Sequence, residues 1–486
     1  MSISLQVDRL PVRIEPDASR VLSRFFWADE EKTRRRIARV MTLSERAVES
    51  IVLDMLQLYV EGHYDIAATW LEHFERVEAL VPTGDGSLST QRQMLIGAYF
   101  TMDYALEAVA LFNPSIVEAL NQEDLEPGAK RFTMSLRAVG EGHLSSIVMR
   151  NGVVDSAGNI ILNKPALASR ALSKEPNPQF STDMIKRTLR DLGAFGRIEE
   201  QVLNRIGITA SPEEIRAELE LVRGSVSSSA QWLRARDNLL SFMESNYCLR
   251  APEGTDLSEL VIFPVSQNES RGIEDLRLVR FTDDDGTTTI IGTYTAFNGY
   301  SIFPTLLMIR DARRVQSYSM SGVYARNKGM AIFPRRINGH YVMSGRLDGE
   351  NLYILQSENL VVWNEGRLSQ EPKHWWQFSV IGNCGSPIET NEGWLMLTHG
   401  VGPMRQYCIG AVLLDLEDPA RVIGELEDPL IAPAEDERVG YVPNVVYTCG
   451  MMLHNGTLII PYAVSDVITK FARVNLDELL AALRRH

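Results

Sequence analysis

The chain has 486 residues, of which 45% are hydrophobic and 23% are charged. This is ordinary for a soluble globular protein, and the length allows one large domain with additions or two to three domains. The net charge of −14 argues against a nucleic-acid or anionic-membrane partner, because both require a basic face. No apolar run approaches the roughly 20 residues of a membrane span, and the start of the chain lacks the features of a signal peptide. We therefore expect a cytoplasmic protein without a membrane or nucleic-acid partner.

The four cysteines indicate neither a disulfide framework nor a zinc site. They are widely spaced and form no CxxC pair: Cys248, Cys384, Cys408 and Cys449. We expect free thiols in a reducing cytoplasm, no metal site and no cofactor.

Residues 1–103 are predicted to form a mostly helical N-terminal region. Apolar residues recur at helical spacing over 47–59 and again over 66–80. A helical domain packed outside something larger is the simplest interpretation.

Residues 104–179 are predicted to supply the first strands of a β-domain. Arg137 stands inside the apolar run 135–139. A buried arginine requires an anionic partner or several acceptors. A structural salt bridge and an anion-binding role explain Arg137 equally well at this point.

Residues 180–246 are predicted to be a helical insertion between strands of that domain. Ser211 is followed by Pro212 and then by Glu214. A serine at the N-cap, proline at the first helical position and glutamate at the third mark the start of a helix.

Residues 247–486 are predicted to be β-structure. Short alternating runs are separated by turn signals such as Asn338-Gly339 and Asn455-Gly456. Many short strands at regular spacing are typical of a sandwich, a barrel or a propeller, and periodicity does not choose among them.

The stretch 271–280 carries the strongest candidate for chemistry. Two adjacent acids, Glu274 and Asp275, stand between basic residues at the start of an apolar alternating run. Neighbouring residues of a regular strand point to opposite faces. We therefore expect Asp275 to face a cleft and Glu274 to point away from it and pair locally, for example with Arg271 or Arg280.

Several segments together resemble glycoside hydrolase family 130, the β-mannoside phosphorylases and mannosidases. The resemblance covers roughly residues 104–165 and 247–475. The segments that carry it are Gly272–Arg277, Asn327–Pro334, Ser344–Arg346, Gly385–Thr390 with Gly393–Trp394, Thr398–Val401, Val442–Tyr447, and Pro461–Ala463 with Asp466.

The resemblance implies a mainly β fold, a five-bladed β-propeller with its site in the central cavity. The N-terminal helices and the 180–246 insertion depart from the compact members of the family. These additions could cover the cavity rim or build the interface of a homo-oligomer.

The resemblance also implies roles for individual residues. Asp275 matches the family's general acid, which protonates the glycosidic bond through a hydroxyl of the mannose. Phosphate-binding roles fall on Asn113, Ser115, Arg137, Lys328, Arg346 and His399, although His399 also fits a sugar contact or a core histidine. Substrate-binding roles fall on Arg277, Tyr294, Tyr441, Asn444 and Asp466, although a tyrosine in a β-rich chain also fits simple packing.

One position departs from the family's phosphorylases, because Glu389 stands where many of them have lysine or arginine. A carboxylate there would repel phosphate, and in a hydrolase it could act as the base. We predict an inverting phosphorylase that uses inorganic phosphate as co-substrate, acts on mannose-containing oligosaccharides linked as β-mannosides, and releases mannose 1-phosphate. The alternatives are an inverting β-mannosidase with Glu389 as catalytic base, a mannosyltransferase of the same fold, and a non-catalytic carbohydrate-binding propeller.

Overall fold

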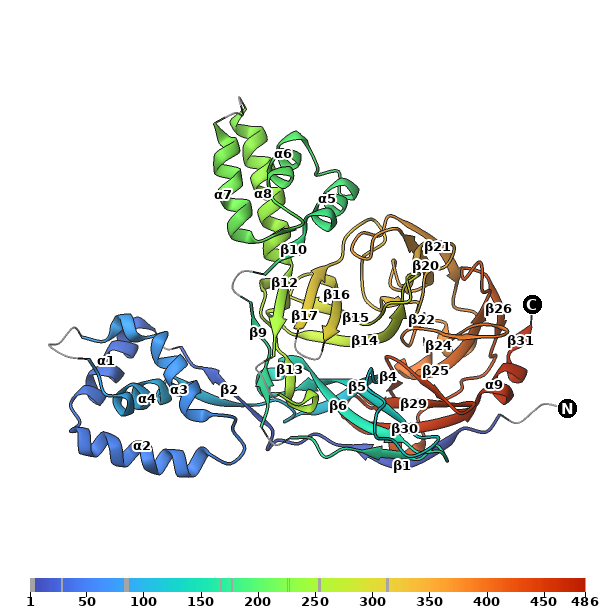
Figure 1. Ribbon diagram of the computed structural model, residues 1–486. Coiled ribbons are helices and arrows are strands. Elements are labelled where there is room, and N and C mark those ends of the chain that lie inside the picture. The colour runs from blue at the N-terminus through green and yellow to red at the C-terminus, as the bar shows by residue number, and fades with distance from the viewer. Residues whose placement is uncertain are drawn as a thin grey trace.

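β-Strands make up most of the chain, as the short alternating runs predict. Five sheets of four to six strands form the main body, and two groups of helices project from it (Figure 1). The chain is therefore mainly β, which confirms the predicted class. The computed structural model describes residues 5–27, 29–82, 87–166, 168–175, 178–224, 226, 228–251, 255–311 and 314–485.

The first two sheets are joined through the region that carries the helical insertion. The first sheet has the order β4 (Ala110–Glu118), β5 (Lys130–Val139), β6 (Ser145–Val154), β13 (Leu260–Ile262) and β8 (Arg170–Ala171), and β7 (Ile160–Leu162) also pairs with β6. The second has the order β14 (Ile273–Thr282), β15 (Thr288–Phe297), β16 (Ile302–Asp311), β17 (Arg314–Ser319), β12 (Tyr247–Arg250) and β9 (Ser173–Lys174).

The remaining three sheets follow in chain order. The third consists of β18 (Ala331–Ile332), β19 (Tyr341–Gly345), β20 (Leu352–Ser357) and β21 (Glu365–Gln370). The fourth consists of β22 (Val380–Asn383), β24 (Gly393–Val401), β25 (Tyr407–Leu414), β26 (Val422–Glu425) and β31 (Arg484–Arg485), with β23 (Ile388–Thr390) also on β24. The fifth consists of β27 (Val446–Tyr447), β29 (Thr457–Val464), β30 (Ile468–Asn475) and β1 (Asp8–Ile14), with β28 (Met452–His454) also on β29.

Residues 8–25 differ from the prediction, because they carry two strands and no helix. β1 pairs antiparallel with β30, so the start of the chain completes the fifth sheet beside one of its last strands (Figure 1). Its side chains alternate between more and less exposed positions, and Ile14 is buried, as expected for an edge strand with one face on a core. β2 (Val21–Phe25) pairs with β3 (Thr101–Ala105) to form a ribbon that leads to and from the helices.

The N-terminal helices form a bundle with a core of its own. They are α1 (Glu30–Met41), α2 (Glu45–Tyr59), α3 (Ile66–Glu75) and α4 (Thr90–Ala98), and each begins at an Asp or Ser side chain that accepts a backbone N–H. Ile37, Val48, Phe74, Leu95 and Phe100 are buried between them.

The insertion lies between two paired strands, β9 and β12, of the second sheet. It contains α5 (Thr182–Asp191), α6 (Arg197–Arg205), α7 (Pro212–Arg223) and α8 (Ser229–Ser245), joined to a short ribbon of β10 (Phe180–Ser181) and β11 (Thr209–Ala210). Ser211 and Glu214 form the predicted capping box at the start of α7.

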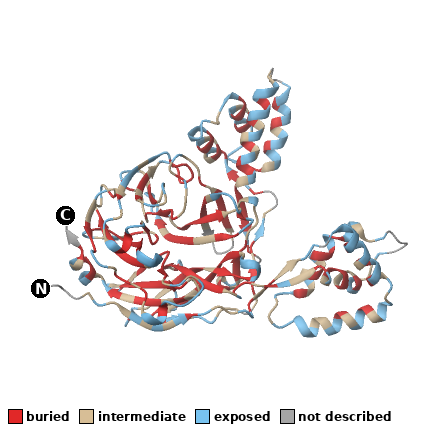
Figure 2. Cartoon of the chain, turned by 180° about the vertical axis from the view of Figure 1, so that it is seen from behind, coloured by how far each residue is buried: buried red, intermediate tan, exposed pale blue. Residues whose placement is uncertain are grey.

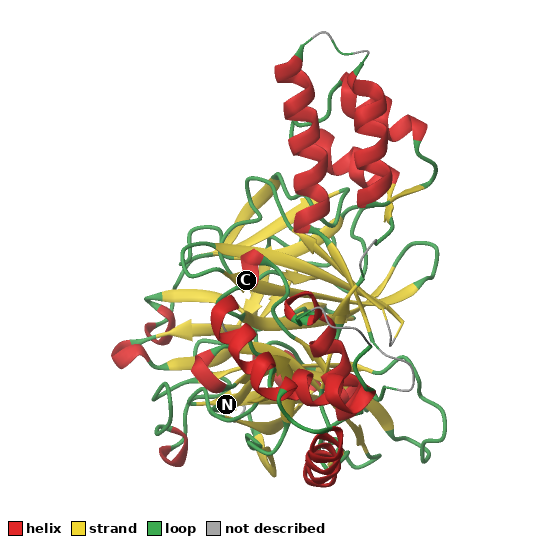
Figure 3. Cartoon of the chain, turned by 90° about the vertical axis from the view of Figure 1, so that its left-hand side faces the viewer, coloured by secondary structure: helices red, strands yellow, loops and turns green. Residues whose placement is uncertain are grey.

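The helices of the insertion share a hydrophobic core with the sheets, whereas the N-terminal helices have a core of their own. Figure 3 shows α5–α8 standing away from the strands, yet Phe180 packs against both Phe242 of α8 and Tyr318 of β17. The core of the insertion is therefore continuous with that of the sheets. Figure 2 shows the buried residues running through the sheets, whereas the projecting helices are largely exposed on their outer sides. None of the described helices is long and apolar enough to cross a membrane.

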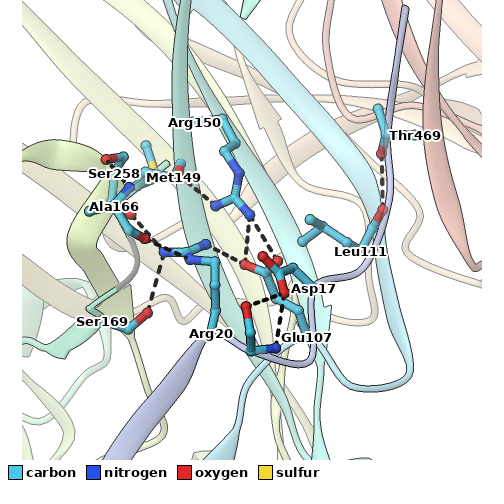
Figure 4. Close-up of polar contacts among 11 residues, drawn as sticks. Asp17, Arg20, Glu107, Leu111, Met149, Arg150, Ala166, Ser169, Ser258 and Thr469 are labelled. Carbon is cyan, nitrogen blue, oxygen red and sulfur yellow. Dashed lines mark hydrogen bonds and ion pairs between the residues drawn. The ribbon is translucent and has the colours of Figure 1, made fainter. Parts of the chain in front are cut away.

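A buried charge cluster fixes the N-terminal ribbon to the first sheet (Figure 4). The guanidinium of Arg20 pairs with the carboxylate of Glu107, and Arg150 donates to both oxygens of that carboxylate at 2.7 and 2.9 Å. Arg20 also donates to the carbonyls of Ala166 (3.2 Å) and Ser258 (2.8 Å). Because Arg20 and Glu107 are fully buried, the charges depend on one another for stability.

Candidate active site

A cavity of about 290 Å³ collects side chains from four of the sheets and from the segments that flank β18 and β19 of the third sheet. We call it the charged cavity. Its polar lining consists of Asn113, Arg137, Glu274, Asp275, Lys328, Arg346, His399, Arg405 and Asp466, and tyrosines 407 and 447 also face it. Seven predicted site residues are therefore brought together: Asn113, Arg137, Asp275, Lys328, Arg346, His399 and Asp466.

Two β-bulges aim the central residues into the cavity. The register of β4 against β5 shifts between Phe112 and Ser115, and that of β14 against β15 shifts between Glu274 and Arg277. Within these bulges Asn113 has φ 49° and Asp275 has φ 52°. Asparagine and aspartate are the side chains that best tolerate this left-handed region. The two residues meet directly, since Asn113 Nδ2 donates to Asp275 Oδ1 at 2.7 Å.

The prediction that Glu274 points away from the cavity is wrong. Both Glu274 and Asp275 line it, because the bulge interrupts the alternation of β14 at this point. Glu274 accepts from Arg137 Nη2 at 3.1 Å through one oxygen and from Lys328 Nζ at 2.6 Å through the other. The predicted local partners, Arg271 and Arg280, are not the ones it uses.

Asp275 is a buried carboxylate surrounded by cations. Burial raises the pKa of Asp275, but the charges of Arg137 and Arg277, the Asn113 hydrogen bond and Lys328 together hold that pKa below its usual range. Arg137 Nη1 lies 3.5 Å from Asp275 Oδ1. With these groups around it, Asp275 is ionised at neutral pH.

Asp466 faces the same cavity with the opposite shift. Burial, and then the negative charge of Asp275, raise the pKa of Asp466 to about 6, against the opposing charges of Arg137 and Arg405. Two carboxyls whose pKa values are pushed apart can serve as proton donor and acceptor in one site.

His399 orients a neighbouring arginine. Its Nδ1 lies 3.1 Å from the carbonyl of Asn383, and its Nε2 lies 3.5 Å from Arg346 Nη1. Burial, and then the charge of Arg346, hold the pKa of His399 well below its usual range. A neutral ring that donates from Nδ1 to a carbonyl presents a lone pair at Nε2. His399 therefore accepts from Arg346 in this arrangement, and because it also lines the cavity its contact with phosphate stays a prediction.

Several polar atoms at the cavity are left without a protein partner. Among the described residues, Asn113 Oδ1, Arg137 Nε and Arg346 Nε are buried and make no hydrogen bond. Buried polar atoms are nearly always satisfied, so such atoms indicate positions where a ligand or water completes the site.

Three predicted contact residues lie behind the cavity wall. Arg277 donates to the carbonyl of Asp275 at 3.0 Å and to the hydroxyl of Tyr447 at 2.6 Å. The Ser115 hydroxyl accepts from the backbone N–H of Leu278 at 2.9 Å. These contacts brace β14, so Arg277 and Ser115 position the site without lining it.

Tyr294 is the third of these residues. It is buried, and its hydroxyl donates to Glu269 at 2.5 Å and lies 3.0 Å from that of Tyr247. The predicted contact of Tyr294 with a sugar is therefore replaced by a core hydrogen-bond network, because its position on β15 faces the interior of the second sheet.

Tyr441 and Asn444 lie on the loop that enters β27. Tyr441 is 58% exposed and stacks on His143 with 5.8 Å between ring centroids. The carbonyl of Asn444 accepts from the backbone of Tyr407 at 3.0 Å. Val442 and Val445 line the charged cavity, so Tyr441 and Asn444 are each adjacent in sequence to the lining without being part of it.

Glu389 does not line the charged cavity. Both oxygens accept from Arg335, at 2.8 and 2.6 Å, and the side chain is 42% exposed. It borders a second cavity of about 390 Å³, which is lined by residues of four sheets and by the segment that follows β18 of the third. This placement argues against Glu389 as a catalytic base.

Sequence analysis missed three residues of the lining. Arg405 follows Met404 in a tight turn where both have positive φ, 55° and 56°, and Tyr407 begins the next strand. Tyr447 lies in the segment Val442–Tyr447 that carries the family resemblance, but the resemblance implies no role for it. For Arg405 the only sequence signal is Gly402-Pro403 after a strand, which predicts a turn without showing where its side chains point.

Comparison with known proteins places these features in a family. Residues 253–485 match the family model described as β-1,4-mannooligosaccharide phosphorylase. A 1,2-β-oligomannan phosphorylase of a Thermoanaerobacter species (strain X514) is 31% identical over 224 residues, which cover 44% of this chain and 74% of that protein. A β-1,2-mannobiose phosphorylase of Listeria innocua is 30% identical over 230 residues, covering 46% and 63%. A β-1,4-mannooligosaccharide phosphorylase of Ruminococcus albus is 32% identical over 172 residues, covering 33% and 51%. The chain belongs to glycoside hydrolase family 130.

Proposed function

We propose that this protein is a phosphorylase of β-mannosides that inverts configuration and releases mannose 1-phosphate. The observation that carries the proposal is the charged cavity itself, where the carboxylate of Asp275 lies beside a group of cations with unpartnered donors. The relatives named above act on β-1,2- and β-1,4-linked mannosides, which supports a β-linked mannooligosaccharide as the substrate.

The proposed fold is a five-bladed β-propeller in which each of the five sheets is one blade. Both cavities are lined by residues of four sheets and by residues next to the strands of the third. Along β4, Asn113 lines the charged cavity and Ile116 lines the second cavity. Along β14, Asp275 lines the charged cavity and Leu278 lines the second. Inner strands that each run from one cavity to the other are what a ring of blades around a central axis requires. The pairing of β1 with β30 supports closure of that ring.

The chemistry requires an acid, a nucleophile and charge compensation. In our proposal Asp275 supplies the proton that the leaving oxygen takes as the bond from the mannose anomeric carbon breaks. A phosphate oxygen forms the new bond to that carbon from the opposite face, which inverts its configuration. Arg346, Lys328 and Arg137 hold the phosphate, because guanidinium and ammonium groups match its charge and geometry.

The placement of Glu389 supports phosphorolysis over a hydrolase that uses Glu389 as its base. A hydrolase requires a carboxylate base opposite the acid. Glu389, the residue predicted for that role, is held by Arg335 outside the charged cavity. The cytoplasmic location and the homo-oligomer remain predictions from the sequence.

The test is to incubate the protein with β-1,2- and β-1,4-mannooligosaccharides, with and without inorganic phosphate, and to identify the products. We expect turnover to require phosphate and to yield α-mannose 1-phosphate. Asp275→Asn serves as the inactive control. Release of free mannose at the same rate without phosphate would overturn the proposal in favour of a hydrolase.

A further inference from the structure

Glu274 is the one carboxylate in the charged cavity that contacts two of its cations at hydrogen-bond distance. Its oxygens lie 3.1 Å from Arg137 Nη2 and 2.6 Å from Lys328 Nζ. Its side chain is 15% exposed, so the contacts are formed largely away from water. Such charge-assisted hydrogen bonds are among the stronger polar contacts in proteins.

The two cations differ in their freedom to move. The Arg137 side chain is 20% exposed and is held from two sides, because it also faces Asp275 at 3.5 Å. Lys328 is 37% exposed, and its long flexible side chain carries a compact charge. Lys328 is therefore the cation that can change partners at low cost.

A second anchor for an anion lies next to Lys328. A Cβ placed on the adjacent residue, Gly329, would lie 3.5 Å from Arg346 Nε, which is one of the buried unpartnered atoms. Among the described residues Arg346 forms no ion pair, and its one polar contact is with His399. Lys328 and Arg346 thus line the same cavity, and Lys328 is paired with Glu274 whereas Arg346 has no anion among the described residues.

We propose that Glu274 is a positioning residue, an internal anion that holds Lys328 and Arg137 while the cavity is empty, and that incoming phosphate competes with it for Lys328. This inference rests on the proposed phosphorylase function. Phosphate docks on Arg346, and Lys328 turns from Glu274 to the phosphate. Glu274 then retains Arg137, so that one cation still faces Asp275. The negative charge of Glu274 therefore weakens phosphate binding and limits how strongly the cations favour the ionised form of Asp275.

This role predicts an unusual combination of effects for Glu274→Gln. The variant keeps the shape and one acceptor oxygen but removes the charge that opposes phosphate. We expect the Kd for inorganic phosphate, measured by calorimetry, to fall on the order of tenfold. We expect kcat to fall as well, because the uncompensated cations make Asp275 harder to protonate. If Glu274 only supported the local structure, its substitution would raise both the Kd and the KM for phosphate.

The controls separate this inference from the proposed function. Glu389→Gln removes the same charge from the second cavity and should leave the Kd for phosphate unchanged. Lys328→Gln should raise that Kd about tenfold, and it tests the transfer of Lys328 even where Glu274→Gln does not fold. An unchanged or raised Kd in a folded Glu274→Gln, or an unchanged Kd in Lys328→Gln, overturns the role of Glu274 while phosphate-dependent turnover stands. Turnover of the unaltered protein without phosphate overturns the proposed function instead.

Discussion

Phosphate binding should load the general acid with its proton. Asp275 is ionised in the empty cavity because Arg137, Arg277 and Lys328 outweigh the effect of burial and hold its pKa below the usual range. An acid in that state cannot protonate a leaving group. Because the protonated carboxyl is neutral, negative charge brought nearby raises the pKa of a carboxyl. A bound phosphate dianion supplies that charge.

The size of the effect follows from the contacts around Asp275. A phosphate bound across Arg137 or Lys328 would lie two hydrogen-bond lengths or slightly more from the carboxylate, on the order of 6–8 Å. Two negative charges at that distance oppose a third by about 4–5 kcal/mol at an effective dielectric constant near 20. Since 1.4 kcal/mol is a factor of ten, the ratio of protonated to ionised Asp275 should rise roughly a thousandfold.

Calorimetry can detect this proton directly. Phosphate is titrated into the protein at pH 7 in two buffers of different ionisation enthalpy, and the difference in heat gives the protons taken up. Because the pKa of Asp275 starts below its usual range, a thousandfold shift protonates at most about a few tenths of this carboxyl at pH 7. We therefore expect the unaltered protein to take up more protons than Asp275→Asn, by at most about a few tenths of a proton, because the ionisation of phosphate itself is the same in both proteins. Asp466→Asn is the second control, because the pKa of Asp466 is raised to about 6 and phosphate should raise it further. Equal proton uptake by the unaltered protein and Asp275→Asn would refute the reasoning.

Three further substitutions test separate parts of the structure. Asp275→Asn should lower kcat by orders of magnitude with an unchanged circular dichroism spectrum, since the amide keeps the shape but cannot donate the proton; near-normal turnover would exclude Asp275 as the acid. Glu107→Gln should lower the free energy of unfolding by about 3–5 kcal/mol in urea, because it leaves Arg20 and Arg150 buried without their anion. The exposed ion pair between Glu389 and Arg335 provides the control. Glu389→Gln should lower the free energy of unfolding by no more than about 1 kcal/mol. Tyr441→Ala should raise the KM for the oligosaccharide and leave the KM for phosphate unchanged, because Tyr441 is an exposed ring next to Val442 of the cavity lining; an equal change in both would argue for a structural role.

The sequence was sufficient for the class of fold and for most of the charged residues of the site. The helices could be predicted because their apolar spacing and caps are local signals, as at Ser211 and Glu214. β1 was missed because its partner, β30, is more than 450 residues away in the chain, and an edge strand carries only a weak alternation. Pairings of that kind are not encoded locally.

Errors in the site have the same physical origin. Strand alternation predicted opposite directions for Glu274 and Asp275, and a single bulge turned both into the cavity. Tyr294 and Ser115 have the right chemistry for ligand binding, but their hydroxyls are used by Glu269 and by the backbone of Leu278. Whether a polar residue faces a ligand or its own core depends on register, which one sequence does not reveal.

Several residues around the charged cavity have a positive φ. Asn113, Asp275, Arg405 and Asp466 line the charged cavity and all have positive φ, while Asn327, beside Lys328, has it too. A non-glycine residue with positive φ is conformationally strained, and the surrounding structure must hold it in that conformation. Here the hydrogen bond from Asn113 to Asp275 and the bracing of β14 by Ser115 and Arg277 provide that restraint. Asparagine and aspartate both reduce that cost and carry the reactive groups, so at these bulges one choice of residue serves the turn and the chemistry together.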